Sequence, residues 1–591
     1  MLKNIFIPKY VFKGIMHNEI AFPKRYTLFG ADTETVRGLP YTFQVSGDGV
    51  HADIEFVNSE NVLDKFLAYI EPRLLAGHVN VIYFHNLKFD LPVLLKQQQG
   101  MFAGKTKLEM TYKGAEFKFI IAKLYFGRIR FAKNKVLTVV DSFAFFVNYS
   151  KASLKYLAKE LDLPSQKLDS MPDIGERKYK AGSADYKKFV EYSKQDAIVE
   201  WHLGAWIIEQ FKKYNTRICV SSPQFSARVF KHYFLKSGDC IAFPPPQATR
   251  GSILSYHGGK NGYYAKVVTV IDKCYEIDVV SMYPYAMKSL PNFLTGKYFH
   301  VRKYTPEFQG VYCISGEIIP DTYPVIFSHD FSPMKGRVRN IWITSYELAE
   351  ALRMNEVELT KCTGWLWRPD GKSVKNPFSD FVDFFFRLKD TAKTPSEKML
   401  AKIILNSLYG KTIQTIEDDK DKTDFKADFT YDPNAHIFLE NRVRNMFMAS
   451  GMFNPFIATL ITGFARAYLH RLEHKFKAIH SSTDSVKTTM IPVEDKRLGG
   501  IKIECCGKCI IFRNKLYLHY NAAGELKKYA LHGFLGRPEK LKEMFDKKVN
   551  TYTTKHLYKV REALRQHKVP LDMAVVNREL LGVDFEKVTY I

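Results

Sequence analysis

The stretch "YEIDVVSMYPYAMKSLP", Tyr275 to Pro291, places one carboxylate near the end of an apolar run and follows it with an aromatic residue and a proline. The apolar run predicts a strand with Asp278 near its tip, and the proline predicts a sharp turn after it. Such a charged tip is typical of either a plain sheet edge or a metal site. A metal site needs a second carboxylate, which another part of the chain must supply.

The second carboxylate is Asp484, which lies in "AIHSSTDSVKTTM", residues 478–490. Its Thr-Asp-Ser turn separates two strand-like runs, so a hairpin tip can hold Asp484 beside Asp278. Two aspartates with a nearby backbone carbonyl can bind two Mg²⁺ ions. Such ions bring a primer 3′-hydroxyl in line with an α-phosphate and neutralise the leaving pyrophosphate. The pattern therefore predicts nucleotidyl transfer.

The segment "KMLAKIILNSLYGKT", residues 398–412, predicts a helix with two unlike faces. The polar and aromatic residues share one face: Lys398, Lys402, Asn406 and Tyr409. Lysines on such a face can neutralise the β- and γ-phosphates of a nucleotide, and Tyr409 can pack on a new base pair. A solvated basic face is the alternative interpretation, which explains Lys398 alone but does not predict the run Asn-Ser-x-Tyr-Gly.

A second group of carboxylates lies in the first half of the chain. In "GADTET", Asp32 and Glu34 occupy alternate positions of a predicted strand, so both side chains leave the same face. Asp90 ends "YFHNLKFD", and "YSKQD" offers Tyr192 and Asp196 at i and i+4 on one helix face. Each pair alone is more simply explained as a solvated face. Four carboxylates and a tyrosine together indicate a two-metal hydrolytic centre.

Length and composition point to a large globular chain with an anionic partner. The 591 residues predict two to four domains, and a formal net charge of +25 fits nucleic acid best. No apolar run has the length of a membrane span, so we expect no membrane role. The N-terminus has neither signal-peptide nor transit-peptide features.

The eight cysteines fit free thiols in a reducing compartment, although Cys506 and Cys509 have metal-ligand spacing.

Patterns along the chain divide it into two parts. Strands are predicted at 26–45 and 79–84, and helices at 60–75, 152–162 and 184–213, which gives an α/β unit over residues 1–215. The best linker is "AFPPPQATRGS", residues 242–252. Residues 216–591 predict an α+β unit with a helical region at 378–410, a helix at 455–475 and strand pairs from 476 to 530.

The first-half motifs resemble those of the RNase H-like, DEDD-type 3′–5′ proofreading exonuclease domain of family B DNA polymerases. The resemblance rests on "DTE", "HNLKFD" and Tyr-x-x-x-Asp in this order. It implies that Tyr192 orients the attacking water and that four carboxylates bind metal ions: Asp32, Glu34, Asp90 and Asp196. It also implies contacts to a frayed DNA 3′ end or single strand from Thr35, His85, Asn86, Phe89, Ser142 and Phe143. Lys167 could be the lysine that such domains place near the scissile phosphate, although its flanking residues match poorly.

The second-half motifs are similar to motifs A, B and C of the same family: "DVVSMYP" at 278–284, "KIILNSLYG" at 402–410 and "STDS" at 482–485. The resemblance implies that Asp278, Asp484 and the Val279 carbonyl bind metal and that Tyr283 is the steric gate against ribose. It implies nucleotide contacts from Lys389, Lys398, Lys402, Asn406 and Tyr409, and DNA contacts from Tyr256, Gly258, Gly259, Lys515 and Tyr517. Motif C departs from the family pattern, because Ser482 stands where the first aspartate is usual.

Within family B, the short chain most resembles the protein-primed subgroup of small phages with linear genomes. The resemblance implies a right-hand polymerase domain with fingers at about 378–410, insertions at about 298–377 and 411–445, and a thumb at about 535–591. The first insertion would dock a terminal protein that primes synthesis. The second is expected to form a β-hairpin that encircles DNA and aids strand displacement. The expected cofactors are two Mg²⁺ per active site, with Mn²⁺ as a substitute, and the expected partners are DNA primer-template, dNTPs and the terminal protein, for a monomer in the host cytoplasm.

Two alternative functions follow from particular features. Ser482 suggests an exonuclease whose degenerate polymerase half only binds DNA, and a templated extension assay separates that function from polymerisation. The net charge of +25 suggests a non-catalytic nucleic-acid-binding protein, which leaves both carboxylate groups unexplained. A DNA polymerase with proofreading explains every motif, and we adopt this interpretation.

Overall fold

The computed structural model of the chain describes residues 5–6, 21–98, 107–121, 125–147, 149, 152–169, 171, 173–236, 239–265, 267–319, 322–327, 333–371, 376–418, 429–432, 437–440, 446–557 and 573–591. Within these ranges, no helix combines the length and the apolar character that crossing a membrane requires.

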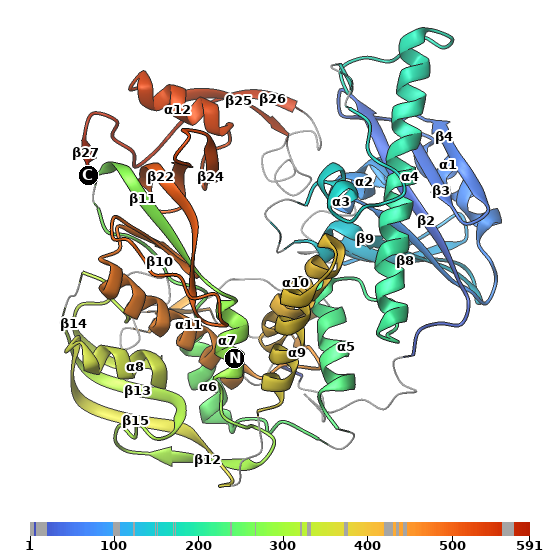
Figure 1. Ribbon diagram of the computed structural model, residues 1–591. Coiled ribbons are helices and arrows are strands. Elements are labelled where there is room, and N and C mark those ends of the chain that lie inside the picture. Colours follow the sequence, from blue (N-terminus) through green and yellow to red (C-terminus); the bar gives the residue numbers. More distant parts are fainter. Residues whose placement is uncertain are drawn as a thin grey trace.

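The first part of the chain folds around a mixed sheet (Figure 1). Its strands follow the order β4 (Val50–Phe56), β3 (Leu39–Gly47), β2 (Tyr26–Val36), β5 (Val79–Phe84), β9 (Lys135–Asp141), β8 (Tyr125–Ala132), β7 (Ala115–Ile121) and β6 (Lys107–Tyr112). β5 pairs in parallel with both β2 and β9, and the other pairs are antiparallel. The stretch 26–45 is therefore two strands, because Arg37 and Gly38 turn the chain at φ values of 50° and 75°.

Helices cover both faces of this sheet. Leu28 and Tyr83 pack towards α4 (Ala184–Lys213), whereas Phe29 and Phe84 pack in the layer of α1 (Val62–Ile70) and α2 (Leu87–Leu94). Strands that are buried on both faces become near-continuous apolar runs. The helices predicted at 60–75, 152–162 and 184–213 are confirmed as α1 with a following 3-10 turn, α3 (Leu154–Glu160) and α4.

The second large sheet contains the opening stretch of sequence. Its strands follow the order β10 (Asn261–Tyr263), β20 (His480–Ser482), β21 (Ser485–Thr488), β11 (Val268–Val279), β22 (Ile501–Arg513), β23 (Leu516–Tyr520) and β24 (Leu526–Leu531). β27 (Val588–Tyr590) pairs with the first residues of β11. Ile277 and Val279 pack against Leu469 and Leu472 of α11 (Pro455–Phe476). The predicted helix at 455–475 and the strand pairs after it are confirmed.

A smaller sheet occupies the stretch for which the first insertion is expected. Its strands follow the order β12 (Gly296–Val301), β15 (Val357–Pro369), β13 (Gln309–Ile318) and β14 (Gly336–Thr344). α8 (Ser345–Arg353) follows β14, and it packs on α11 of the neighbouring sheet. A capping box at Thr344 and Glu347 fixes the start of α8.

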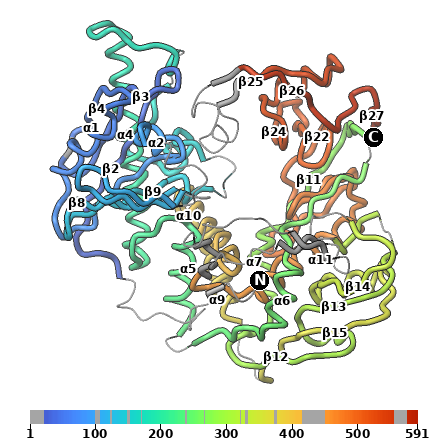
Figure 2. The backbone as a smooth tube through the Cα atoms, turned by 180° about the vertical axis from the view of Figure 1, so that it is seen from behind, coloured from blue at the N-terminus to red at the C-terminus, as the bar shows by residue number. Residues whose placement is uncertain are grey.

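Two helices lie between the two large sheets, as both views show (Figures 1 and 2). These are α9 (Pro377–Thr391) and α10 (Pro395–Ser407). α10 has the two faces predicted for it, because Leu400 and Ile404 are buried whereas Lys398 and Lys402 are exposed. Trp206 of α4 donates a hydrogen bond from Nε1 to Ser396 Oγ at 2.8 Å, which ties α10 to the first part of the chain.

The predicted linker at 242–252 is wrong. Residues Pro246–Leu254 form α6, in which Ala248, Thr249 and Ser252 are buried. The prolines that suggested a linker start this helix, because proline suits the first helical positions. At Gly251 a Cβ would lie 2.3 Å from the Trp342 ring, so the glycine permits close packing on β14.

The hairpin predicted for the second insertion is present. β17 (Phe429–Asp432) pairs antiparallel with β18 (Ile437–Glu440), and β16 (Thr415–Asp418) pairs antiparallel with β19 (Met446–Ala449). β1 (Ile5–Phe6) adds to β19 in parallel. The rest of the insertion, at 419–428, 433–436 and 441–445, lies outside the described residues.

Gly30 sets how closely α4 approaches β2, and this approach generates a prediction. A Cβ at Gly30 would lie 2.1 Å from the backbone nitrogen of Trp201, so Gly30→Ala must push the helix away. We expect the free energy of unfolding to fall by about 1–3 kcal/mol, the usual cost of overpacking. Gly371→Ala is the matched control, because a Cβ there meets nothing within 4 Å. Urea unfolding measures both variants, and equal effects would contradict the packing argument.

Candidate active sites

Three carboxylates of the first part of the chain converge. Asp32 and Glu34 leave the same face of β2, and Asp196 faces them from α4, so that one oxygen of each lies within 4.8 Å of the others. The missing side chain of Gly30, two residues before Asp32, allows α4 to lie this close. Oxygen ligands from carboxylates suit hard divalent cations, so the donor set fits Mg²⁺ or Mn²⁺.

Asp90 lies next to these three carboxylates, but its side chain forms hydrogen bonds with Thr33. Its Oδ1 accepts hydrogen bonds from the backbone N–H and the hydroxyl of Thr33, at 3.1 and 2.7 Å. Burial raises the pKa of Asp90 well above its usual value, and the charge of Asp32 adds to this. The structure thus places the fourth predicted ligand beside the group, bonded to the β2 backbone.

The carboxylates repel one another in a poorly solvated place. Desolvation raises the pKa of Asp32 to about 7, and the charge of Asp196 contributes to the rise. Lys167, which the sequence supported only weakly, partly offsets the repulsion: its Nζ donates to Asp196 Oδ2 at 2.6 Å. The same ammonium lies 5.5 Å from the ring centroid of Tyr192. Lys167 and Tyr192 therefore flank the carboxylates together.

The residues expected to contact single-stranded DNA flank this group, but they differ in exposure. Asn86 is exposed, and Thr35 and Phe89 are half-buried. His85 instead uses both ring nitrogens internally, on Ser142 Oγ at 2.9 Å and on the Ala152 carbonyl at 2.8 Å. The geometry therefore gives His85 a supporting position, with its ring against Phe143 at 5.7 Å.

Sequence reasoning missed Asp141, which organises this edge of the sheet. Its Oδ1 accepts hydrogen bonds from the backbone N–H groups of Asn86 and Phe143, at 2.9 and 3.0 Å. Asn86 has a left-handed backbone with φ of 74°, so it needs such an anchor. The signal was present in the sequence, since Asp141 ends an apolar strand directly before Ser142 and Phe143.

The structure places Asp484 beside Asp278, as the hairpin prediction requires. β20 and β21 form a tight hairpin around Thr483 and Asp484, and Thr483 adopts a φ of 56° at the turn. Asp278 lies opposite Ser485 in the β11–β21 register. The Val279 N–H also donates to the carbonyl oxygen of Asp484 at 2.8 Å. Two strands distant in sequence thus present their carboxylates at one point.

Desolvation and mutual repulsion also act on this second pair. Desolvation raises the pKa of Asp484 to about 7, and the charge of Asp278 adds to the rise. Lys502 Nζ lies 3.2 Å from Asp278 Oδ2. Ser482 does not replace a carboxylate here, because its hydroxyl donates to Asn261 Oδ1 at 3.2 Å. The donor set again suits divalent cations with oxygen ligands.

A basic and aromatic surface faces the second pair. The rings of Tyr283 and Tyr409 stack at a centroid distance of 4.2 Å and an interplanar angle of 5°. Desolvation lowers the pKa of both Lys389 and Lys402, and the ammonium of Lys502 adds to the effect in each. Three lysines from α9, α10 and β22 therefore converge here, while Lys398 is exposed and Asn406 is half-buried on α10.

Comparison with known proteins agrees with this geometry. The family described as "DNA polymerase type B, organellar and viral" matches residues 172–443, a span that contains motifs A and B. Over this span the chain is similar to the type B DNA polymerases. A relative, the DNA-directed DNA polymerase of Enterobacteria phage PRD1, is 24% identical over 434 residues, which are 69% of this chain and 72% of that protein.

Solved structures share the fold of this chain. Phi29 DNA polymerase complexed with single-stranded DNA has a TM-score of 0.66 at 18% identity, over 94% of this chain and 100% of that chain. The complex of Phi29 DNA polymerase with primer-template DNA has a TM-score of 0.65 at 17% identity, with the same coverage. The likeness confirms the predicted multidomain fold, which the chain shares with these structures over nearly its whole length.

Arg466 of α11 is a further buried residue near the second pair that sequence reasoning missed. It is 1% exposed, and its Nη1 donates to the carbonyl oxygens of His257 and Gly258, at 2.5 and 3.1 Å. Its Nε donates to Glu347 Oε1 at 2.6 Å. Arg466 thereby holds the "YHGG" loop of Tyr256 and Gly259 on the sheet. An arginine inside the otherwise apolar helix 455–469 was the available signal.

That loop reaches the β20–β21 hairpin, which carries Asp484. A Cβ at Gly259 would lie 2.7 Å from Thr483 Cγ2 and 3.0 Å from the Tyr283 hydroxyl, so only a glycine fits without displacement. On the other side, Lys515 turns the chain between β22 and β23 with φ of 56°. Tyr517 is buried, with Lys487 Nζ 3.9 Å from its ring centroid.

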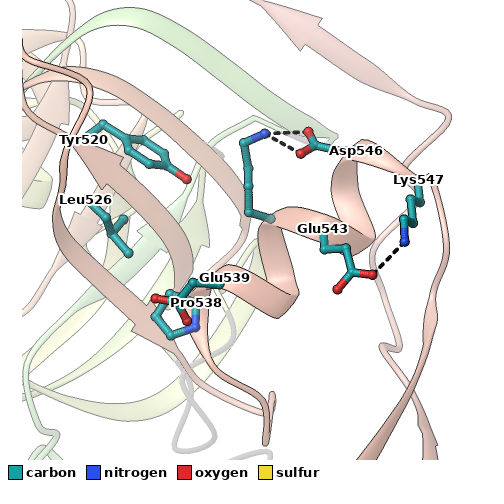
Figure 3. A pocket seen from close by; sticks show the side chains of 8 residues that line it. Tyr520, Leu526, Pro538, Glu539, Glu543, Asp546 and Lys547 are labelled. Atoms are coloured by element: carbon teal, nitrogen blue, oxygen red, sulfur yellow. Dashed lines mark hydrogen bonds and ion pairs between the residues drawn. The ribbon is translucent and has the colours of Figure 1, made fainter.

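A hollow of about 430 Å³ lies elsewhere, between α12 (Pro538–Asp546) and the strands that carry Tyr520 and Leu526 (Figure 3). Its charged side chains pair with one another, since Lys542 contacts Asp546 at 2.5 Å and Lys547 contacts Glu543 at 2.8 Å. Four of the charged side chains that line this hollow are therefore engaged in ion pairs with one another. The sequence favours free thiols over a metal pair at Cys506 and Cys509, and among the described residues Cys509 is buried and groups with Cys274 and His519 rather than with Cys506.

The buried ion pair of Arg466 generates a prediction. Arg466→Met leaves Glu347, which is 4% exposed, without its cation, and breaking such a pair costs about 3–5 kcal/mol of unfolding free energy. The double variant Arg466→Met with Glu347→Gln should recover part of the loss, because no unpaired charge stays buried. Urea unfolding followed by circular dichroism measures this. A double variant no more stable than the single one would show that the ion pair is not the cause.

Proposed function

We propose that this chain is a DNA-directed DNA polymerase with a 3′–5′ proofreading exonuclease, and that it starts synthesis from a protein primer. The observation that carries the proposal is the pair of carboxylate groups in two different sheets: Asp278 with Asp484, and Asp32 with Glu34 and Asp196. A binding protein needs neither group, and a nuclease alone needs only one.

For polymerisation, Asp278, Asp484 and the Val279 carbonyl would hold two Mg²⁺ ions, with Mn²⁺ as a substitute. When bound, these ions supply the positive charge that aligns a primer 3′-hydroxyl and stabilises the leaving pyrophosphate. Lys389 and Lys402 bind the triphosphate in this proposal, as mobile point charges beside the metal site. Their lowered pKa values support the role, because crowded ammonium groups favour an anionic ligand.

For nucleotide selection, Tyr283 excludes ribonucleotides by its bulk beneath the sugar, and Tyr409 packs on the new base pair. The parallel stack of the two rings, with centroids 4.2 Å apart, supports this role. Gly259 limits movement of the Tyr283 hydroxyl from the other side. A ring held on two sides discriminates by shape better than a mobile one.

For proofreading, Asp32, Glu34, Asp90 and Asp196 would bind metal ions at the scissile phosphate. Tyr192 orients the attacking water, and Lys167 neutralises the phosphate or the developing charge. The 2.6 Å contact between Lys167 Nζ and Asp196 supports the assignment of Lys167 to this centre.

The proposed partners are DNA primer-template, dNTPs and a terminal protein, for a monomer in the host cytoplasm. The net charge of +25 fits binding of the DNA backbone. Solved structures of Phi29 DNA polymerase are complexes with single-stranded DNA and with primer-template DNA and incoming nucleotide substrates. The sheet of residues 296–369 would dock the terminal protein, and the hairpin at 411–445 would encircle DNA during strand displacement.

The two centres should be separable by mutation. Asp484→Ala should abolish templated nucleotide addition while leaving 3′–5′ degradation, because each centre has its own ligands. Asp32→Ala combined with Glu34→Ala should do the reverse. Primer-extension gels with and without dNTPs, run with Mg²⁺, measure both activities on one substrate.

Other outcomes of this experiment identify a different function. A wild-type chain that degrades the primer but never extends it is an exonuclease with a degenerate polymerase half. Absence of any Mg²⁺-dependent turnover leaves a binding protein. Loss of both activities in either variant would mean that the substitution disturbs a shared fold.

Replacement of Tyr283 tests the steric gate. Tyr283→Val should raise ribonucleotide incorporation relative to deoxyribonucleotide by roughly tenfold or more, because discrimination by pocket shape depends on the removed bulk. Tyr283→Phe keeps the ring and is the matched control, so its selectivity should stay close to wild type. Single-nucleotide kinetics give the ratio of kcat/KM values. Unchanged selectivity in the valine variant would locate the gate at another residue.

Deletion of residues 416–440 tests the clamp. We expect single-nucleotide addition to persist, while products become shorter and synthesis through duplex DNA stops, because the hairpin no longer retains the template. A Gly-Ser linker across the gap keeps the ends of the insertion joined. Product length is measured with a trap that captures released enzyme. Long products from one binding event in the deletion variant would refute both the clamp and its support for protein priming.

A further inference from the structure

A third group of potential metal ligands lies outside both carboxylate centres. His470 and His474 of α11 meet Glu356, the residue directly before β15, with one ligand atom of each within 4.8 Å of the others. His470 is fully buried, Glu356 is 3% exposed and His474 is half-buried. The group lies where α11 of the second large sheet meets the small sheet of residues 296–369.

The three ligand atoms have the spacing of a metal site. Histidines at i and i+4 share one helix face, so both Nε2 atoms point the same way, and they lie 3.2 Å apart. Glu356 Oε1 lies 2.7 Å from His470 Nε2. Two ligands about 2.0–2.1 Å from a tetrahedral zinc ion lie about 3.3 Å from each other. Small adjustments of the carboxylate would therefore admit the ion.

Hydrogen bonding alone serves the Nε2 atom of His470 poorly. His470 Nε2 offers either one proton or one lone pair in the ring plane, yet it faces both Glu356 Oε1 and His474 Nε2. If it donates to the carboxylate, it has no lone pair for His474. A divalent cation accepts lone pairs from all three atoms at once.

The surroundings are those of a histidine ligand held by a second carboxylate. His470 Nδ1 is buried without a hydrogen-bond partner among the described residues, and Glu350 Oε2 lies 3.8 Å from it. Metal-bound histidines commonly direct the other ring N–H to a carboxylate, which fixes the tautomer that binds metal. Glu356 is held as well, because its Oε2 accepts the Val325 N–H at 3.1 Å.

We propose that His470, His474 and Glu356 bind one zinc ion. Two imidazole nitrogens and one carboxylate oxygen favour Zn²⁺ over the Mg²⁺ of the carboxylate centres. Water would complete the tetrahedron from the side of His474, which is the exposed side of the group. The ion would join α11 to the sheet of residues 296–369, and α11 leads directly into the hairpin of Asp484.

The cluster of Cys274, Cys509 and His519 is a weaker candidate. Both His519 nitrogens already contact acceptors, Glu276 Oε2 at 3.2 Å and the Cys274 carbonyl at 3.3 Å. The buried ammonium of Lys487 pairs with Glu276 beside them. A cation there would meet a lysine and displace two existing contacts.

Metal content tests the proposal. The chain is stripped with EDTA, re-equilibrated with Zn²⁺ in excess Mg²⁺ to fill the carboxylate centres, and desalted for elemental analysis. We expect wild type to retain one zinc ion more than His474→Ala and Glu356→Gln. His51→Ala, at an exposed histidine of β4, is the matched control and should retain the wild-type content. Equal zinc in wild type and His474→Ala would overturn the proposal.

X-ray absorption of wild type with one equivalent of zinc provides a test that needs no variant, so a variant that fails to fold leaves the question decidable. We expect a first shell with two imidazole nitrogens. A shell of oxygen atoms alone would place the ion at a carboxylate centre and refute the site. The competing arrangement, a charged His470 between Glu350 and Glu356 with no metal, predicts no retained zinc at all.

Discussion

Carboxylates held side by side in poorly solvated places are the constraint on which both centres depend. Desolvation raises the pKa of Asp484 and of Asp32, and the neighbouring carboxylates add to the rise, so each centre favours a bound cation. Two local features hold these carboxylates together. Gly30 has no side chain, which lets α4 pack closely on β2, and the turn at Thr483 positions Asp484. Lys167 and Lys502 relieve part of the repulsion through ion pairs with Asp196 and Asp278. The remaining repulsion favours multivalent cations.

Beneath the second centre, a buried ionic network fixes the strand that carries Asp278. Glu276 lies two residues earlier on β11 and contacts Lys487 of β21, His519 of β23 and Lys528 of β24. The network therefore joins strands on both sides of β11. Removal of one partner from such a network leaves an uncompensated charge, which is more costly than replacing the whole set by apolar residues. These contacts fix how β11 is aligned with β21, and so how Asp278 is aligned with Asp484. This accounts for the polar groups in this part of the core.

The sequence predicted those parts that depend on local pattern. Asp32 with Glu34, and Lys398 with Lys402, share faces because strand and helix periods are regular. The turn at Arg37 and Gly38 inside a strand-like run, and α6 inside a proline-rich stretch, were missed because tertiary packing decides them. Arg466 and Lys167 were missed or given little weight because their partners, Glu347 and Asp196, lie far away in sequence. Pairs that are distant in the sequence produce no local periodicity from which they could be predicted.

The pairing of β11 has a consequence for how the chain folds. β22 lines one edge of β11, whereas β21 and β27 share the other edge. The strand that carries Asp278 therefore has open backbone groups until residues 588–590 are available. Such high contact order slows folding and exposes a sheet edge to association with other nascent chains. Until residues 588–590 leave the ribosome, the first residues of β11 lack this partner and are open to pairing with other strands.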